Sequence, residues 1–230
     1  MDRNAASLPR WLWLWFPPVV AIIVFGVKLA SPLNYDRYIE GELGLVELAT
    51  PVIAFWGFGV GIVVLGRLGQ LPILVRGWVL SVTLACLYLG GEEVSWGQQL
   101  VHWETPSEIA TLNDQNETNL HNMSSWFDQK PRLLLELWIL IGGIIVPLRH
   151  RNASLSRPAN EFWNWFWPTF ECLPTAVLAI AIKLPERYKK IMGLDVLPFE
   201  IRWSEPQEYY FALFLLIYLL ALRARLARND

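Results

Sequence analysis

The chain has 230 residues, of which 54% are hydrophobic and only 17% are charged. Soluble domains carry about 25% charged residues, so this composition excludes an ordinary soluble domain. The formal net charge is −2 and there is no strongly basic segment, which argues against nucleic acid as a partner.

Six apolar runs are long enough to cross a hydrocarbon core of about 30 Å. They predict an all-α fold, a polytopic transmembrane helical bundle that forms one integral membrane domain over residues 1–230. The lipid bilayer is then its first partner. A polar loop, residues 100–131, joins spans three and four and is expected to fold over the outer face. The expected spans are residues 11–30, 43–65, 77–99, 132–148, 162–182 and 209–224.

The first apolar stretch, Trp11 to Val27, is longer than the apolar core of a signal peptide, which is about 7–15 residues. We therefore expect it to be a retained span. Tryptophans crowd its start, as is typical of a helix end at headgroup level. Pro17 and Pro18 follow at once and predict a kink.

The short connections predict the orientation. The turn that holds Arg67 and Arg76 is purely basic, whereas the connection at residues 31–42 is mostly acidic. Short basic segments favour the cytoplasmic side, so we expect both termini in the cytoplasm of a multi-pass protein of the cell (inner) membrane. This orientation places the basic group Arg187, Lys189 and Lys190 outside, against the same rule.

Acidic side chains recur at one predicted depth. At about 1.5 Å per residue, Glu92 and Glu93 lie about 22–24 Å above the start of span three, just below the outer interface. Glu47 and Glu136 lie about 7 Å below the same interface in spans two and four. Carboxylates at such depth usually face the bundle interior and indicate a site or pathway. The alternative is that ragged helix ends simply let these side chains reach water.

The pair Glu92 and Glu93 is the centre of the candidate site. On a continuous helix Ser95, Trp96 and Gln99 share the face of Glu92, and Glu93 points about 100° away. Two close carboxylates repel as anions, so they favour either a shared cation or a shared proton. The pattern therefore indicates a general acid–base pair or a metal site.

A second polar group lies in the loop. Glu117 and His121 are four residues apart, so on a helix both could bind one divalent ion, Zn, Mn or Fe, together with His102 and Glu92. We expect Glu92, Glu93 and Glu117 to be the catalytic residues. The supporting residues would be Glu47, Ser95, Trp96, Gln99, Asn119, Asn122 and Glu136. An equally direct interpretation is a structural hydrogen-bond network in which His121 donates to Glu117 or Glu92.

Three short segments carry a resemblance. They are Gly91 to Gln98 (GEEVSWGQ), Glu104-Thr105-Pro106, and Asn119-Leu120-His121-Asn122, with Gly44 to Glu47 and Thr50 at the entry to span two. Together they resemble the signature of a family of uncharacterised multi-pass bacterial membrane proteins. The resemblance covers roughly residues 40 to 125 and implies a membrane location but no activity.

Three functions fit these features. The first is a metal-dependent hydrolase or related lipid-modifying enzyme that acts on a lipid substrate at the outer leaflet. The second is a non-enzymatic subunit for assembly or interaction, whose polar residues only lock the loop. The third is a carrier coupled to protons or cations, although the sequence has none of the inverted repeats common in carriers.

Overall fold

A computed structural model describes residues 8–40, 44–69, 71–101, 103–105, 125–149, 161–197 and 201–227. Every regular element within these ranges is helical, as the sequence predicts. Six helical segments of this part of the chain are long and apolar enough to cross a membrane, which confirms the bundle of about six spans and makes the chain a multi-pass membrane protein. They cover Trp11–Ala30, Leu45–Arg67, Ile73–Glu93, Gln129–Arg149, Phe162–Met192 and Ser204–Leu226.

The two π-helical elements are η1 and η3, and the two 3₁₀ elements are η2 and η4. In chain order the elements are η1 (Trp11–Trp15), α1 (Phe16–Ala30), α2 (Pro32–Tyr38), α3 (Leu45–Arg67), α4 (Ile73–Glu93), η2 (Ser95–Gly97), α5 (Gln98–Val101), α7 (Ser125–Trp138), η3 (Ile139–Ile145), α8 (Val146–Arg149), α9 (Phe162–Phe166), η4 (Phe170–Cys172), α10 (Leu173–Ala181), α11 (Leu184–Met192) and α12 (Ser204–Leu226).

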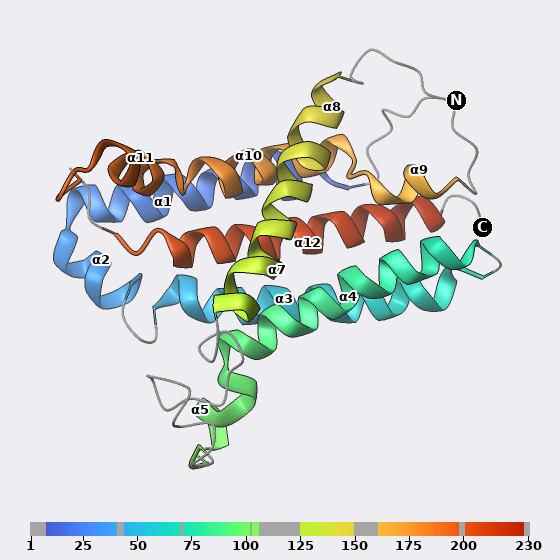
Figure 1. Ribbon diagram of the computed structural model, residues 1–230, viewed down its shortest axis with the longest axis horizontal. Coiled ribbons are helices and arrows are strands. Elements are labelled where there is room, and N and C mark those ends of the chain that lie inside the picture. The colour runs from blue at the N-terminus through green and yellow to red at the C-terminus, as the bar shows by residue number, and fades with distance from the viewer. Residues whose placement is uncertain are drawn as a thin grey trace.

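The last span, α12, is the core of the bundle. Figure 1 shows it between α1 and α10 on one side and α3 and α4 on the other, with α7 crossing obliquely. Almost every side chain from Tyr209 to Leu222 is buried. Because α12 is apolar around its whole circumference, it needs neighbours on every face, and the other spans supply them.

Small residues let α3 and α4 pack closely. A Cβ atom built on Gly57 would lie 3.0 Å from Cys86 Sγ, and one on Gly61 would overlap the side chain of Thr83. The Thr83 hydroxyl donates to the backbone carbonyl of Val79 at 2.7 Å, so this polar side chain is satisfied within its own helix. Close approach at small residues is a common way for membrane helices to associate.

Span five is broken, where the sequence led us to expect one helix over residues 162–182. The backbone is extended at Trp167 (φ −81°, ψ 130°) and Thr169 (φ −80°, ψ 171°), which separates α9 from η4 and α10. Pro168 lies between these two residues and its ring cannot continue a helix. A second change of direction, just before Pro185, separates α10 from α11.

The bundle has two ends, and different elements lie at each. The start of η1 and the end of α12 lie toward the same side of Figure 1, together with α8, α9 and the turn between α3 and α4. The opposite part contains α2, the first turn of α3, the last turn of α4 and the first turns of α7 and α12. We call this part the glutamate end, because Glu47, Glu93 and Glu208 lie in or next to those turns and Glu136 of α7 contacts Gln207 at the start of α12.

Candidate functional site

Carboxyl groups from three spans meet at the glutamate end. The carboxyl group of Glu93, the last residue of α4, lies beside that of Glu208 of α12, within hydrogen-bonding reach. Glu47, in the first turn of α3, lies close enough to Glu93 to act on it electrostatically. Arg132 of α7 forms an ion pair with Glu208 and adds positive charge beside Glu93. We call Glu47, Glu93, Glu208 and Arg132 the carboxyl cluster.

The closeness of the Glu93 and Glu208 carboxyl groups has a direct chemical meaning. Two ionised carboxylates side by side repel each other and can only accept hydrogen bonds, so the two groups bond to each other when one of them carries a proton. One group is then an acid and the other a base, held within reach of each other. Such a pair is able to give a proton and take one back without a change in position.

Glu136 belongs to an adjoining set of contacts one helical turn along α7 from Arg132. The amide of Gln207 donates to Glu136 Oε1 at 2.8 Å and lies 3.2 Å from the carbonyl of Ala179. Arg187 of α11 forms an ion pair with the same carboxylate. Glu136 therefore connects α7, α11 and α12 and is not an isolated group at a ragged helix end. This ion pair also gives a counter-charge to Arg187, one member of the basic group Arg187, Lys189 and Lys190 that the predicted orientation places outside.

Glu92 points into a different environment. Its side chain is 5% exposed, and Trp96 Nε1 donates to Glu92 Oε1 at 2.6 Å. The shared helical face predicted for Glu92, Ser95, Trp96 and Gln99 is wrong, because α4 ends at Glu93. Ser95 (φ 45°) and Trp96 (φ 55°) have left-handed backbone conformations that no helix can continue through. The contact between Glu92 and Trp96 thus comes from a sharp turn of the chain after α4.

Glycine at two positions makes this turn possible. A Cβ atom on Gly91 would lie 2.8 Å from the Trp96 ring, so only glycine leaves room for the indole. Gly97 has φ +99°, a conformation that favours glycine, and it faces the ring of Trp103. Gln98 Nε2 then donates to the carbonyl of Trp103 at 3.1 Å and to Thr105 Oγ1 at 2.8 Å. Residues 94–98 (VSWGQ) therefore form a compact turn after α4, and Gln98 binds the start of the following loop.

Several predicted site residues lie outside the described part of the chain. They are His102, Glu117, Asn119, His121 and Asn122, and the side chain of Gln99 is likewise outside it. The proposed ligand set of Glu92, His102, Glu117 and His121 is therefore represented only by Glu92. Within the described ranges, no group of three or more histidine, cysteine, aspartate or glutamate side chains could hold a metal ion.

Sequence reasoning missed Glu208, Gln207 and Arg132. The two acids of α12, Glu205 and Glu208, are near the start of a helix, where acidic side chains commonly complement the helix dipole, so their positions alone do not indicate a site. Glu205 does have a local partner, since Arg202 Nη1 lies 3.1 Å from its carboxylate. Glu208 instead turns toward α4 and α7. The available signal was a run of polar residues, Gln207 and Glu208, extending into an apolar span.

Comparison with protein family models, curated proteins and solved structures finds no match.

Proposed function

We propose that this protein is a membrane-embedded enzyme that uses the carboxyl cluster for acid–base chemistry on a lipid substrate, in a hydrolytic or related lipid-modifying reaction. The observation that supports this best is the closeness of the Glu93 and Glu208 carboxyl groups, which belong to different spans. Glu93 acts as the proton-transferring group, Glu208 as its partner, and Glu47 and Arg132 set the charge around them. General acid–base catalysis by a positioned side chain typically contributes about 10²- to 10⁴-fold to a rate.

The location of the cluster favours a lipid substrate. All its members are in the first two turns or the last turn of membrane spans. A substrate whose reacting bond lies near the headgroups reaches this level without leaving the bilayer. A soluble substrate would have to enter a layer in which exposed apolar side chains dominate.

Packed aromatic side chains toward the end of the bundle opposite the glutamate end argue against a carrier. There the indole of Trp78 donates to the Tyr218 hydroxyl at 2.8 Å, and that hydroxyl donates to the carbonyl of Trp165. The ring of Trp138 packs against Trp78 and Tyr218 at centroid distances of 5.1 and 5.0 Å. A proton or cation that crosses the membrane needs a polar path, and these packed rings fill the route beside α12.

The proposal also has a metal-dependent form. It assigns His102, His121, Glu92 and Glu117 as ligands of Zn, Mn or Fe, and the bound ion would supply a polarised water as nucleophile. Elemental analysis of the purified protein tests this form directly. A content below about 0.2 metal equivalents, unchanged in His121→Ala, would exclude it and leave the carboxyl mechanism.

The alternative of an assembly or interaction subunit is favoured by the same ionic contacts. Arg132 with Glu208, and Arg187 with Glu136, connect helices far apart in the chain. In that case the acids stabilise the bundle and perform no chemistry. The two functions are distinguished by a substitution that keeps a hydrogen-bond donor at the position but removes the titratable carboxyl group.

Glu93→Gln is that substitution, because the amide still donates to Glu208 but cannot act as an acid or base. The full-length protein is placed in bilayers of phosphatidylcholine and phosphatidylglycerol, and the lipids are followed by mass spectrometry. We expect new lipid products with the wild type, about 10²-fold slower formation with Glu93→Gln, and an unchanged unfolding temperature. Glu186→Gln, which removes an exposed carboxylate of α11, is the control and should behave as wild type.

Two results would contradict the enzyme. One is a wild-type lipid profile identical to that of protein-free bilayers. The other is product formation by Glu93→Gln at the wild-type rate. Unfolding of Glu93→Gln, with Glu186→Gln intact, would instead support the structural role.

A further inference from the structure

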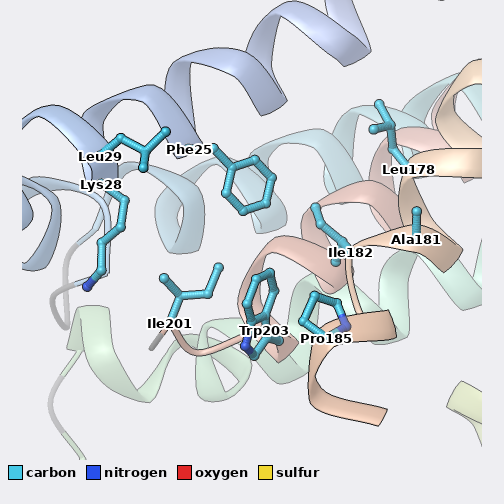
Figure 2. A pocket seen from close by; sticks show the side chains of 9 residues that line it. All are labelled: Phe25, Lys28, Leu29, Leu178, Ala181, Ile182, Pro185, Ile201 and Trp203. Atoms are coloured by element: carbon cyan, nitrogen blue, oxygen red, sulfur yellow. The ribbon is translucent and has the colours of Figure 1, made fainter. Parts of the chain in front are cut away.

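A cavity of about 380 Å³ opens between α1 and α10 at the glutamate end (Figure 2). Phe25 and Leu29 of α1 form one wall, and Leu178 and Ile182 form the other. Trp203, just before α12, closes the inner side. The volume falls within the range of about 300–1,000 Å³ that is usual for small-molecule sites.

The lining is apolar throughout. Lys28 contributes only its aliphatic stem, and Figure 2 shows its amine directed away from Phe25 and Trp203. That amine lies 2.8 Å from Asp36 Oδ1 and 4.6 Å from the centre of the Tyr35 ring. Burial, with the nearby Glu40 carboxylate, raises the pKa of the Tyr35 hydroxyl, so this phenol stays neutral beside the ammonium group. The polar groups of α2 thus mark the membrane boundary, and the cavity extends from there toward hydrocarbon.

The surroundings identify hydrocarbon as the occupant. Leu29 of α1 lines the cavity and is 65% exposed, and Val177 of α10, one turn before the lining residue Ala181, is 43% exposed. Both helices are membrane spans, so these side chains face lipid tails. An apolar cavity that opens on such a surface is reached by acyl chains, the apolar component of the bilayer itself.

The adjoining helix α11 indicates the headgroup. Pro185, at its start, lines the cavity. Further along, Tyr188 and Ile191 expose 54% and 81% of their surface, while Lys189 and Lys190 occupy the last turn. A helix with exposed apolar residues on one side and basic residues on another lies in the membrane interface and attracts anionic lipid.

We propose that the cavity between α1 and α10 binds one acyl chain of an anionic phospholipid, whose phosphate faces Lys189 and Lys190 of α11. This site is separate from the carboxyl cluster and does not depend on the proposed enzymatic function. It assigns a role to the basic residues of α11 that the predicted orientation leaves unexplained.

Photo-crosslinking tests the acyl chain. The full-length protein is reconstituted with phosphatidylglycerol that carries a diazirine in one chain, and the labelled peptides are identified by mass spectrometry. We expect labelling of α1 near Phe25 and of α10 near Ile182. Ala181→Phe fills the cavity from an exposed lining position and should reduce that labelling about tenfold, the loss equivalent to displacing two methylenes. Val177→Phe, one turn earlier and outside the lining, is the matched control and should not change it.

Headgroup selectivity is tested with phosphatidylcholine of the same chains. We expect phosphatidylglycerol to compete better, and Lys189→Gln with Lys190→Gln to reduce this preference about fivefold for each lysine removed. Arg76→Gln, which removes a charge from α4 at the other end of the bundle, should leave it unchanged. Labelling unaltered by Ala181→Phe, or spread evenly over all spans, would overturn the acyl site. Equal competition by the two lipids would overturn the anionic headgroup.

Discussion

The turn after α4 depends on the absence of a side chain at Gly91, and Gly91→Ala should disrupt it. The added methyl would lie 2.8 Å from the Trp96 ring, well inside van der Waals contact. Trp96 is 43% exposed, so its indole can move toward the membrane surface and relieve the overlap. Moving the indole breaks its 2.6 Å hydrogen bond to Glu92 and removes the support for the left-handed backbone at Ser95.

The cost of Gly91→Ala follows from these contacts. A hydrogen bond to a charged group contributes about 1.5–3 kcal/mol. Replacing a helical glycine by alanine returns about 0.5–1 kcal/mol. The net loss of unfolding free energy is therefore about 0.5–2.5 kcal/mol.

Gly77→Ala is the matched control in the same helix, because a Cβ atom there meets nothing within 4 Å. It should keep or raise the stability by up to about 1 kcal/mol. The assay is denaturant unfolding of both variants in the same micelles, together with hydrogen exchange over residues 91–98. Faster exchange in this segment is expected only for Gly91→Ala. Equal stability and equal exchange in the two variants would refute the proposed role of Gly91.

Two further substitutions test contacts on either side of the bundle. Arg132→Gln removes the cation that pairs with Glu208, and we expect a loss of about 2–4 kcal/mol in unfolding free energy, since the remaining partly buried carboxylate loses its counter-charge. Arg76→Gln should change the stability by less than about 0.5 kcal/mol, and an equal loss in both would contradict the pairing. Tyr218→Phe removes a buried hydroxyl that joins an indole to a backbone carbonyl, which should cost about 1–3 kcal/mol in thermal unfolding. The exposed Tyr188→Phe should be silent, and a silent Tyr218→Phe would show that this hydroxyl contributes nothing.

The spans could be predicted because length and apolarity alone decide whether a segment crosses a bilayer. The first span, residues 11–30, has the predicted bounds. Span three was extended too far, because a helix was assumed to continue through Ser95 and Trp96. Hydrophobic periodicity does not reveal that Ser95 and Trp96 have left-handed backbone conformations. Gly97, which follows them, is a residue typical of turns.

The carboxyl cluster was only half predictable. Depth along a helix follows from counting residues, so Glu47 and Glu93 could be placed at one level. The rotation of α4 about its axis is set by tertiary packing, and it directs Glu93 toward α12 while Glu92 meets Trp96. Without that rotation, sequence reasoning placed Glu92 and Glu93 together at the centre of one site. The partner Glu208 comes from a span more than 100 residues away in the chain, a pairing that no local pattern encodes.

The central claim is that acidic side chains of different spans meet, and a double-mutant cycle between Glu93→Ala and Glu208→Ala tests it most directly, because each alanine removes the interacting group altogether. Residues in contact are coupled by about 0.5–3 kcal/mol, whereas distant residues are additive within about 0.5 kcal/mol. We predict a coupling of at least about 1 kcal/mol in unfolding free energy for this pair, and additivity for Glu93→Ala with Glu186→Ala. Additive effects of Glu93→Ala and Glu208→Ala would contradict the carboxyl cluster.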